Sequence, residues 1–238
     1  MTLLSVVIPA YNEEKTILRV LNKVKSLDLK SVKKEIIVVS DGSKDNTLKI
    51  AKSVKGIKVI SLPFNQGKGA AVRAGIANST GGIIIIQDAD FEYNPEEYPS
   101  IIEPILSGKA QVVYGSRFLS LLNKERAGIV RKHEGAYTFH SLGSRIVTFT
   151  TNLLFNTKIT DEATCYKCFK SEVIKAIKIE NNGFAWEPEV TAKIARRGIK
   201  IYEVPISYKP RTFEEGKKIN WKDGLEALWT LLKYRIVK

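Results

Sequence analysis

Five short runs of apolar, mostly β-branched residues in the first half of the chain constrain its fold more than any other feature. They lie at 3–8, 35–40, 57–61, 82–87 and 110–115, and each is continuous rather than alternating. Runs of this length are typical of strands that are buried on both faces of a sheet. Segments with helical character separate them. This β-α-β-α order predicts an α/β fold with a mostly parallel sheet flanked by helices.

The segments between these runs carry helix-start signals. Asn12 precedes two glutamates, and an N-cap followed by acidic residues favours the positive end of a helix. Further helices are expected after the run DGSKDNT and over 68–79. Asn94 and Pro95 predict the start of a fourth helix, because asparagine caps helices and proline fits their first turn.

The second half of the chain is less regular. Residues 119–137 carry charge and glycine without periodicity, and we expect a mobile loop there. Helices are expected over 138–155 and over WEPEVTAKIARRG, which Gly198 ends, and IKIYEVPISY is expected to be a strand. No repeat or low-complexity linker divides the chain. One domain is therefore expected over residues 1–218.

The C-terminal segment 219–238 is expected to be an amphipathic helix. Six apolar residues are spaced 4, 3, 1, 3 and 4 apart, which places them on one helical face. They are Trp221, Leu225, Leu228, Trp229, Leu232 and Ile236. Lysine and arginine lie off that face. The helix is expected either to pack on the domain or to lie on anionic lipid at a membrane surface.

The composition bounds the class of protein. The chain has 238 residues, of which 44% are hydrophobic, so a sizeable core is expected and disorder is not. No apolar stretch approaches the roughly 18 residues needed to span a bilayer, and the amino terminus lacks the features of a signal peptide. The two cysteines, Cys165 and Cys168, are expected to be free thiols. These features predict a cytoplasmic protein.

The formal net charge is +13, which suits nucleic acid, an anionic membrane or phosphorylated small molecules as partners. A nucleic-acid-binding module is the weaker hypothesis, because the basic residues are spread along the chain and do not form a stripe interleaved with aromatic residues. A dinucleotide-binding oxidoreductase is disfavoured, because no G-x-G-x-x-G follows the first strand.

Acidic residues stand where three predicted strands end. In an extended segment, residues two apart point to the same side, so Asp88, Asp90 and Glu92 are expected to converge. Asp41 ends the second strand and Glu13 follows the first. Ligands of open α/β sheets bind beyond the carboxyl ends of the strands, and carboxylates suit Mg²⁺ or Mn²⁺. The alternative is a solvated acidic loop before a helix cap.

Several ordered motifs resemble a known family. SVVIPAYNEE, EIIVVSDGSKDNT, NQGKGAAVRAGI, IIQDADFE and VVYGSRF resemble the nucleotide-sugar-dependent glycosyltransferases of family 2, which have the GT-A fold. The second half, through DEATCYKCF, GFAWEPEV and YEVPISYKPRTFEEGKKI, resembles the branch of dolichyl-phosphate mannose synthase and related polyprenyl-phosphate glycosyltransferases. The resemblance implies an inverting, metal-dependent transferase. It would move a hexose from GDP-mannose or UDP-glucose to a polyprenyl phosphate at the cytoplasmic face of a membrane.

The resemblance also implies contacts to the donor nucleotide at two strand ends. In the family, the loop after the first strand holds the base and the ribose, and the acid that ends the second strand helps to hold the base. The matching residues of this chain are Pro9, Tyr11, Glu13, Val39 and Asp41.

The Asp-x-Asp element of the family, with the residue two positions further on, binds the ribose and the metal–diphosphate group. It matches Asp88, Ala89, Asp90 and Glu92, and the three acids are the expected ligands of Mg²⁺ or Mn²⁺. Relatives often carry glutamine at the last of these positions, so Glu92 adds a negative charge. A divalent ion held there would neutralise the charge on a leaving nucleoside diphosphate.

Basic residues are assigned to the phosphate groups. Arg117 of GSR, and Arg211 and Lys218 of KPRTFEEGKK, match family positions over the donor phosphates, which guanidinium groups bind in a bidentate way. Arg131, in the expected loop, matches the position that meets the acceptor phosphate. Asp90, Arg117 and Arg131 are therefore the expected catalytic residues.

The chemistry of the acceptor decides whether a general base is needed. A phosphate is already anionic at neutral pH, so it can attack the anomeric carbon of the sugar without one. The alternative acceptor, a glycan or glycolipid hydroxyl, requires a base. Asp161 and Glu187 are the candidates for that role.

Overall fold

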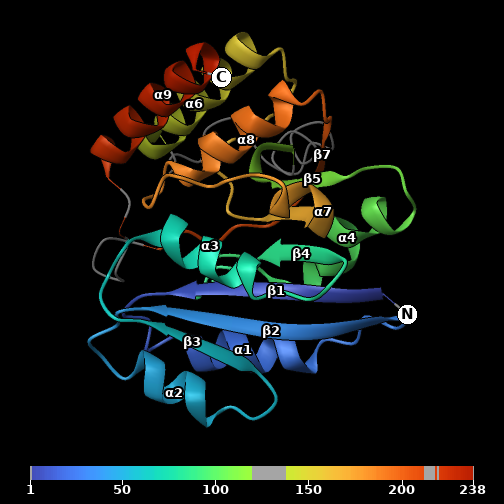
Figure 1. The fold of residues 1–238 in the computed structure, drawn as a ribbon, viewed down its shortest axis with the longest axis vertical. Coiled ribbons are helices and arrows are strands. Elements are labelled where there is room, and N and C mark those ends of the chain that lie inside the picture. Colours follow the sequence, from blue (N-terminus) through green and yellow to red (C-terminus); the bar gives the residue numbers. More distant parts are fainter. Residues whose placement is uncertain (1, 120–137, 212–217, 219, 238) are drawn as a thin grey trace.

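The computed structural model describes residues 2–119, 138–211, 218 and 220–237. Its centre is a seven-stranded sheet in the order β3-β2-β1-β4-β6-β5-β7 (Figure 1). β6 runs antiparallel to both neighbours and the other paired strands are parallel, which confirms the predicted α/β fold. The strands are β1 (Thr2–Ala10), β2 (Val32–Asp41), β3 (Lys58–Leu62), β4 (Ile83–Ile86), β5 (Val112–Ser116), β6 (Lys167–Lys170) and β7 (Ile201–Pro205).

Helices cover both faces of this sheet, and for this reason the central strands are apolar throughout. The helices are α1 (Ile17–Ser26), α2 (Thr47–Ser53), α3 (Lys68–Ala77), the 3₁₀ turn η1 (Pro95–Glu97), α4 (Tyr98–Leu106), α6 (Thr138–Phe155), α7 (Ser171–Lys175), α8 (Trp186–Arg196) and α9 (Trp221–Ile236). Val6 and Ile8 belong to one buried cluster with residues of α1 and α4. Val7 belongs to a second cluster with residues of α3, α7 and α8.

Of two helix caps predicted from the sequence, the one at Asn12 is wrong and the one at Asn94 is confirmed. Asn12 does not cap α1, which begins at Ile17. Its backbone has a φ of +50°, and its side-chain oxygen accepts a hydrogen bond from the Lys44 amide at 2.8 Å, so it ties the loop after β1 to the loop after β2. Asn94 does act as a cap. Its side chain accepts from the Glu96 amide and starts η1, which leads into α4.

The register of the sheet brings three strand ends to one edge. Pro9 lies opposite Val39 in β2, and Val7 lies opposite Ile86 at the end of β4. The Gln87 amide then donates to the Val7 carbonyl at 2.9 Å, which extends this pairing by one residue. The segments that follow β1, β2 and β4 therefore begin side by side, as the strand pattern predicts.

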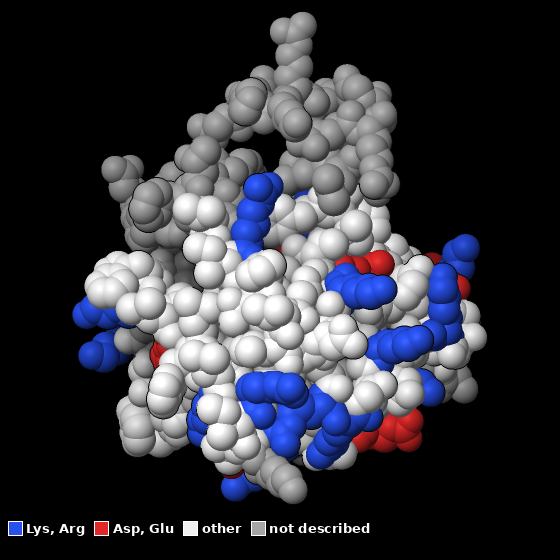
Figure 2. Space-filling model, turned by 90° about the horizontal axis from the view of Figure 1, so that it is seen from above, with Lys and Arg blue, Asp and Glu red and all other residues white. Residues whose placement is uncertain are grey.

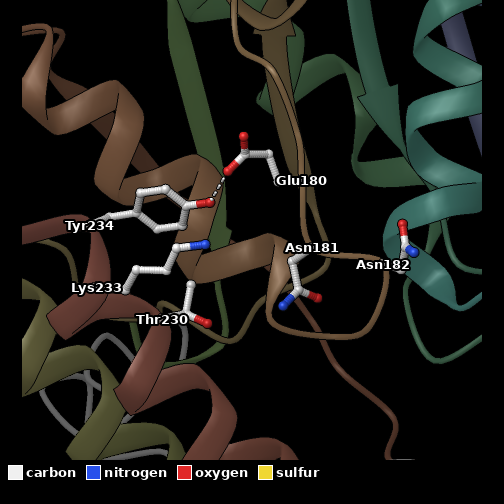
Figure 3. Close-up of a pocket in the computed structure, with 6 residues that line it drawn as sticks. All are labelled: Glu180, Asn181, Asn182, Thr230, Lys233 and Tyr234. Atoms are coloured by element: carbon white, nitrogen blue, oxygen red, sulfur yellow. Dashed lines mark hydrogen bonds between the residues drawn. The ribbon is translucent and has the colours of Figure 1, made fainter. Parts of the chain in front are cut away.

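The C-terminal helix is present and packs against α6 and α8, and Figure 1 shows the three helices together at one end of the molecule. The packed face of α9 is formed by Ala227, Thr230, Leu231 and Tyr234. The Tyr234 hydroxyl donates to Glu180 at 2.7 Å, beside a small pocket that shares no residue with the acidic groove described below (Figure 3). The apolar face predicted from the sequence is largely the outward one, because five of its six residues are exposed.

Within the described residues, no helix has the length and apolar character needed to cross a membrane. Both cysteines are free thiols, as expected. The loop expected over 119–137 lies, beyond its first residue, outside the described part of the chain.

One buried ion pair supports the antiparallel strand β6. The Lys167 ammonium is fully buried, lies 3.5 Å from the Glu162 carboxylate and 3.7 Å from the centre of the Tyr114 ring, and donates to the Glu162 carbonyl at 2.8 Å. Thr191 also donates to the Glu162 carboxylate at 2.8 Å. Burial raises the pKa of Glu162 to about 7, although Lys167 opposes the shift.

This pKa predicts a pH-dependent stability. Between the ordinary glutamate pKa of 4.5 and about 7, the folded state keeps a proton on Glu162 that the unfolded state has lost, so the free energy of unfolding falls as the pH rises. Urea unfolding at pH 5, 6 and 7 should show a fall that is smaller in Glu162→Gln, by about 1–3 kcal/mol across the window. The exposed control Glu172→Gln should follow the wild type; equal slopes in all three proteins would contradict the assignment.

Candidate functional site

Three carboxylates at the carboxyl edge of the sheet converge on the guanidinium of Arg211. Glu13, from the loop after β1, lies 3.0 Å from it, and Asp90, from the loop after β4, lies 2.8 Å from it. Glu92 lies 3.6 Å from Arg211 Nε and accepts from the Arg211 backbone amide at 2.7 Å. Lys218 adds a second cation, 2.6 Å from Glu13. All five residues line one open groove.

The three carboxylates in this groove outnumber the two cations that contact them. Burial, together with the charges of Asp88 and Glu92, raises the pKa of Asp90 to about 7 against the opposing charge of Arg211. A carboxyl group with such a pKa is only partly ionised at neutral pH. Additional positive charge at this place would therefore be bound favourably.

Asp88 is not among the residues that line this groove, whereas the sequence predicts that it converges with Asp90 and Glu92. Its carboxylate lies 2.8 Å from the ammonium of Lys68, which also lies 3.3 Å from Glu187. The extended geometry behind the prediction ends with β4, and Phe91 has a φ of +64°. Among the described residues, no three His, Cys, Asp or Glu side chains are arranged to hold a metal ion. The metal-ligand role of Asp88, Asp90 and Glu92 stays a prediction, although Asp88 is paired with Lys68 in this structure.

Lys68 is a residue that the sequence argument did not assign. Its ammonium is enclosed by Asp88 and Glu187, and it donates to the Cys165 thiol at 2.8 Å. The surrounding acids raise the pKa of Lys68 well above its ordinary value despite burial. The signal was present in the sequence, because Lys68 belongs to the NQGK motif.

Asp41 binds the backbone and side chain of the same NQGK motif through hydrogen bonds. Its carboxylate accepts from the backbone amides of Gln66 and Gly67, both at 2.8 Å, and from the Asn65 side chain at 3.0 Å. Gly67 has a φ of +102°, and a Cβ there would lie 2.3 Å from the Asn182 carbonyl oxygen, so glycine is required. Asp41 therefore fixes the turn that delivers Lys68 to the start of α3.

The other predicted nucleotide contacts are mostly buried. Pro9, Val39 and Ala89 lie in the interior, next to the groove but not exposed in it. Tyr11 is half-buried, and its ring lies 5.6 Å from the Lys218 ammonium. The Tyr11 carbonyl also accepts a hydrogen bond from Lys218.

Arg117 is joined to the groove through an aromatic side chain. Its guanidinium forms a bidentate pair with the fully buried Asp161, with both contacts at 2.7 Å. It also lies 4.9 Å from the centre of the Tyr208 ring, and the Tyr208 hydroxyl donates to Glu92 at 2.9 Å. Tyr208 was not assigned from the sequence, although it belongs to the motif that contains Arg211. Arg131, the predicted acceptor residue, lies outside the described residues.

Comparisons with known proteins place this site in context. The family model described as "Glycosyl transferase family 2" matches residues 5–178. A dolichyl-phosphate beta-glucosyltransferase of Trichomonas vaginalis is 32% identical over 252 residues, which cover 98% of this chain and 73% of that protein. A UDP-N-acetylglucosamine–dolichyl-phosphate N-acetylglucosaminyltransferase of Methanococcus voltae is 26% identical over 257 residues, which cover 99% of this chain and 97% of that protein.

Solved structures share the fold. Glucosyl-3-phosphoglycerate synthase from Mycobacterium tuberculosis in complex with UDP has a TM-score of 0.75 and 21% identity, and the match covers 100% of this chain and 81% of that one. The same protein in complex with Mg²⁺ and UDP has a TM-score of 0.74 and 22% identity, with 100% and 80% covered. At this identity the likeness is one of fold.

The arrangement around Arg211 predicts a loss of stability when its charge is removed. Arg211→Ala should lower the free energy of unfolding by about 1–3 kcal/mol at pH 8, because three carboxylates then face each other without their cation. The loss should shrink at pH 6, where Asp90 takes up a proton. Urea denaturation measures both values. Lys209→Ala, which removes an exposed charge two residues away, is the matched control, and a loss no larger than in that control would refute this role.

Proposed function

Since this chain belongs to glycosyl transferase family 2 and has the GT-A fold, we propose that it transfers a hexose from a nucleotide-sugar donor to a polyprenyl phosphate of the dolichyl type. The chain is a hexosyltransferase. The names of two relatives support this acceptor, because both act on dolichyl phosphate. The groove in which Glu13, Asp90 and Glu92 surround Arg211 is the observation that carries the proposal. It brings together a guanidinium that can bind phosphate and carboxylates that can hold a divalent cation.

We assign the diphosphate of the donor to the end of the groove that holds Arg211 and Lys218. Both side chains are cationic and reach the groove, and guanidinium groups bind phosphate oxygens in a bidentate way. Their present partners are carboxylates, so an arriving diphosphate would compete with Glu13 and Asp90 for them. Arg117 packs on the Tyr208 ring, and the Tyr208 hydroxyl donates to Glu92. We therefore assign Arg117 an indirect role in positioning Glu92.

The groove fits a divalent cation. Its carboxylate oxygens are the hard ligands that Mg²⁺ and Mn²⁺ prefer, and the pKa of Asp90, raised by burial and by the charges of Asp88 and Glu92, supports a site that would gain from added positive charge. Asp90 and Glu92 would hold the ion together with phosphate oxygens of the donor, since Mg²⁺ is commonly bound by one or two carboxylates plus substrate phosphates. Such an ion supplies charge neutralisation to the leaving diphosphate. Structures of the mycobacterial synthase with Mg²⁺ or Mn²⁺ and UDP support this assignment.

We favour a UDP-linked sugar over GDP-mannose as the donor. One relative is named for a UDP-sugar, another for glucosyl transfer, and the structural neighbours are complexes of UDP. We assign Tyr11, which contacts Lys218, and the turn held by Asp41 to the base and ribose.

The state of the two candidate bases favours a phosphate acceptor. Asp161 is bound by Arg117 in a bidentate pair, and Glu187 accepts from Lys68 and from the Cys165 thiol. Both carboxylates are engaged by a cation, so neither stands as an unpaired base beside the groove. An acceptor phosphate needs no base: its oxygen forms the bond to the anomeric carbon, the bond from that carbon to the nucleoside diphosphate breaks, and inversion follows. Arg131 stays our proposed acceptor-phosphate residue, and we propose action at the cytoplasmic face of the membrane.

A transfer assay tests the donor and acceptor together. Purified protein with Mn²⁺ should transfer labelled sugar from UDP-glucose or UDP-N-acetylglucosamine to a detergent-dispersed polyprenyl phosphate. It should give at least about ten-fold less product with the corresponding polyprenol, which lacks the attacking phosphate. GDP-mannose serves as the competing donor. Preference for polyprenol or a free glycan would favour the hydroxyl-acceptor alternative, and mannose transfer would reverse our choice of nucleotide.

Asp90→Asn tests the cation site. We expect kcat/KM to fall by roughly a thousand-fold or more, because the groove loses a charged ligand whose effect falls on the transition state. The same change should abolish the extra thermal stabilisation that Mn²⁺ gives together with the donor, while the folded state persists. Glu103→Gln, an exposed carboxylate on α4, is the control. Transfer by Asp90→Asn at the rate of that control would refute the role of Asp90.

A further inference from the structure

We propose that α6 and α9 together form a docking surface for an anionic lipid bilayer. The two helices carry nine large apolar side chains that are at least 45% exposed, which we call the two-helix apolar face. They are Leu142, Ile146, Phe149 and Leu153 on α6, and Trp221, Leu225, Trp229, Leu232 and Ile236 on α9. Along each helix these residues recur at intervals of three or four, so each set forms one stripe.

The size of this exposure sets it apart from scattered surface apolar residues. Phe149, Leu153, Trp221 and Trp229 are between 67% and 70% exposed, and Ile236 is 81% exposed. Soluble proteins rarely leave a contiguous apolar patch of this kind uncovered unless it binds something. Elsewhere in the described part of the chain, the exposed large apolar residues are single ones on different elements, such as Leu18 and Leu106.

The two-helix apolar face is held rigidly by the opposite sides of the same helices. Ala227, Leu231 and Tyr234 of α9 form a buried cluster with Val147 of α6 and Ala192 of α8. Arg196 of α8 donates to the Tyr234 carbonyl at 2.9 Å, near the end of α9. The outward residues are therefore not the inner face of a helix that has failed to dock.

Charge at the margin of the face identifies the partner. Arg145, Lys222, Lys233 and Arg235 are exposed on the two helices. Figure 2 views this end of the molecule, and the charged side chains around its broad uncharged surface are mostly Lys and Arg. The acids of α9 lie near its start, where Asp223 forms the capping box and Glu226 accepts from Asn181. An apolar stripe edged by cations is the pattern of helices that lie in the interface of an anionic membrane.

The same charges disfavour a second copy of the chain as the partner. Two such faces packed together would place Lys222, Lys233 and Arg235 of one molecule near cations of the other. A bilayer offers anionic head groups to these residues and hydrocarbon to the tryptophans. Trp221 is also only three residues from Lys218, which pairs with Glu13 in the acidic groove. Docking would thus set the groove beside the lipid that carries the proposed acceptor, and in this respect the inference rests on the proposed function.

Co-sedimentation of the full chain with vesicles tests this surface, without donor or acceptor present. The protein should bind vesicles of equal parts phosphatidylcholine and phosphatidylserine, and binding should weaken in high salt. The pair of changes Phe149→Ser and Trp229→Ser should lower the apparent partition constant by roughly ten-fold or more. Leu232→Ser should lower it measurably, whereas Leu106→Ser, a leucine of almost equal exposure at the end of α4, should not. Lys222→Gln with Arg235→Gln should weaken binding to the anionic vesicles only.

Controls separate folding, self-association and catalysis. Each variant should unfold at or near the temperature of the wild type, because the changed side chains are exposed, and it should retain transfer to a detergent-dispersed polyprenyl phosphate. Absence of vesicle binding by the wild type, or binding unaffected by the Phe149 and Trp229 changes, would overturn the proposal. Dimerisation in ultracentrifugation that these changes abolish would assign the face to a second copy instead. Loss of transfer in the wild type would count against the proposed function and leave the docking result standing.

Discussion

The contact between the Arg211 guanidinium and three carboxylates is the interaction on which the groove depends. Glu13, Asp90 and Glu92 come from loops after two different strands, and like charges at this spacing repel. Arg211 reaches them from the segment that follows β7, so it closes the carboxyl edge of the sheet with residues nearly 200 positions away from Glu13. The backbone of the same segment supports the contact, since the Lys209 amide donates to the Glu92 carbonyl and the Arg211 amide to the Glu92 side chain.

Two further charge pairs surround this groove and limit the chemistry available to it. Asp88 and Glu187 share Lys68, and Asp161 is bound by Arg117. These carboxylates are largely buried, so each would be costly without its cation. Each is therefore held by a cation, and the groove is left with the cations and the acids to which we assign phosphate and metal binding. An acceptor that brings its own negative charge is the one this arrangement suits.

The sequence predicted the parts of the fold that depend on local pattern. Each of the five apolar runs became a strand, because burial on both faces leaves a continuous run. The antiparallel strand β6 was missed, because KCFK contains two lysines and is too short to signal a strand. Lys167 is accommodated there through Glu162, five residues before it, and through the Tyr114 ring, which is distant in sequence. Tertiary contacts of this kind leave no trace in a pattern.

The same limit explains the outcome at the site. The sequence identified Glu13, Asp90, Glu92 and Arg211 but could not tell that Arg211 would pair with the acids, or that Asp88 would turn to Lys68 once the chain left β4.

The C-terminal helix α9 shows that an amphipathic pattern can predict which residues share a face without predicting what that face contacts. Five of the six apolar residues predicted to share a face of α9 are exposed and Leu228 is half-buried, while the helix packs on the domain through alanine, threonine, leucine and tyrosine on another side. A helix that is apolar on two sides has two surfaces to cover, and α8 and α6 cover one. The exposed stripe of α6 lies in the same structural layer, so a single flat partner could cover both helices at once. Lys218, which pairs with Glu13 in the groove, is only three residues from Trp221 at the start of α9. Binding at the outer face of α9 would therefore take place close to the groove.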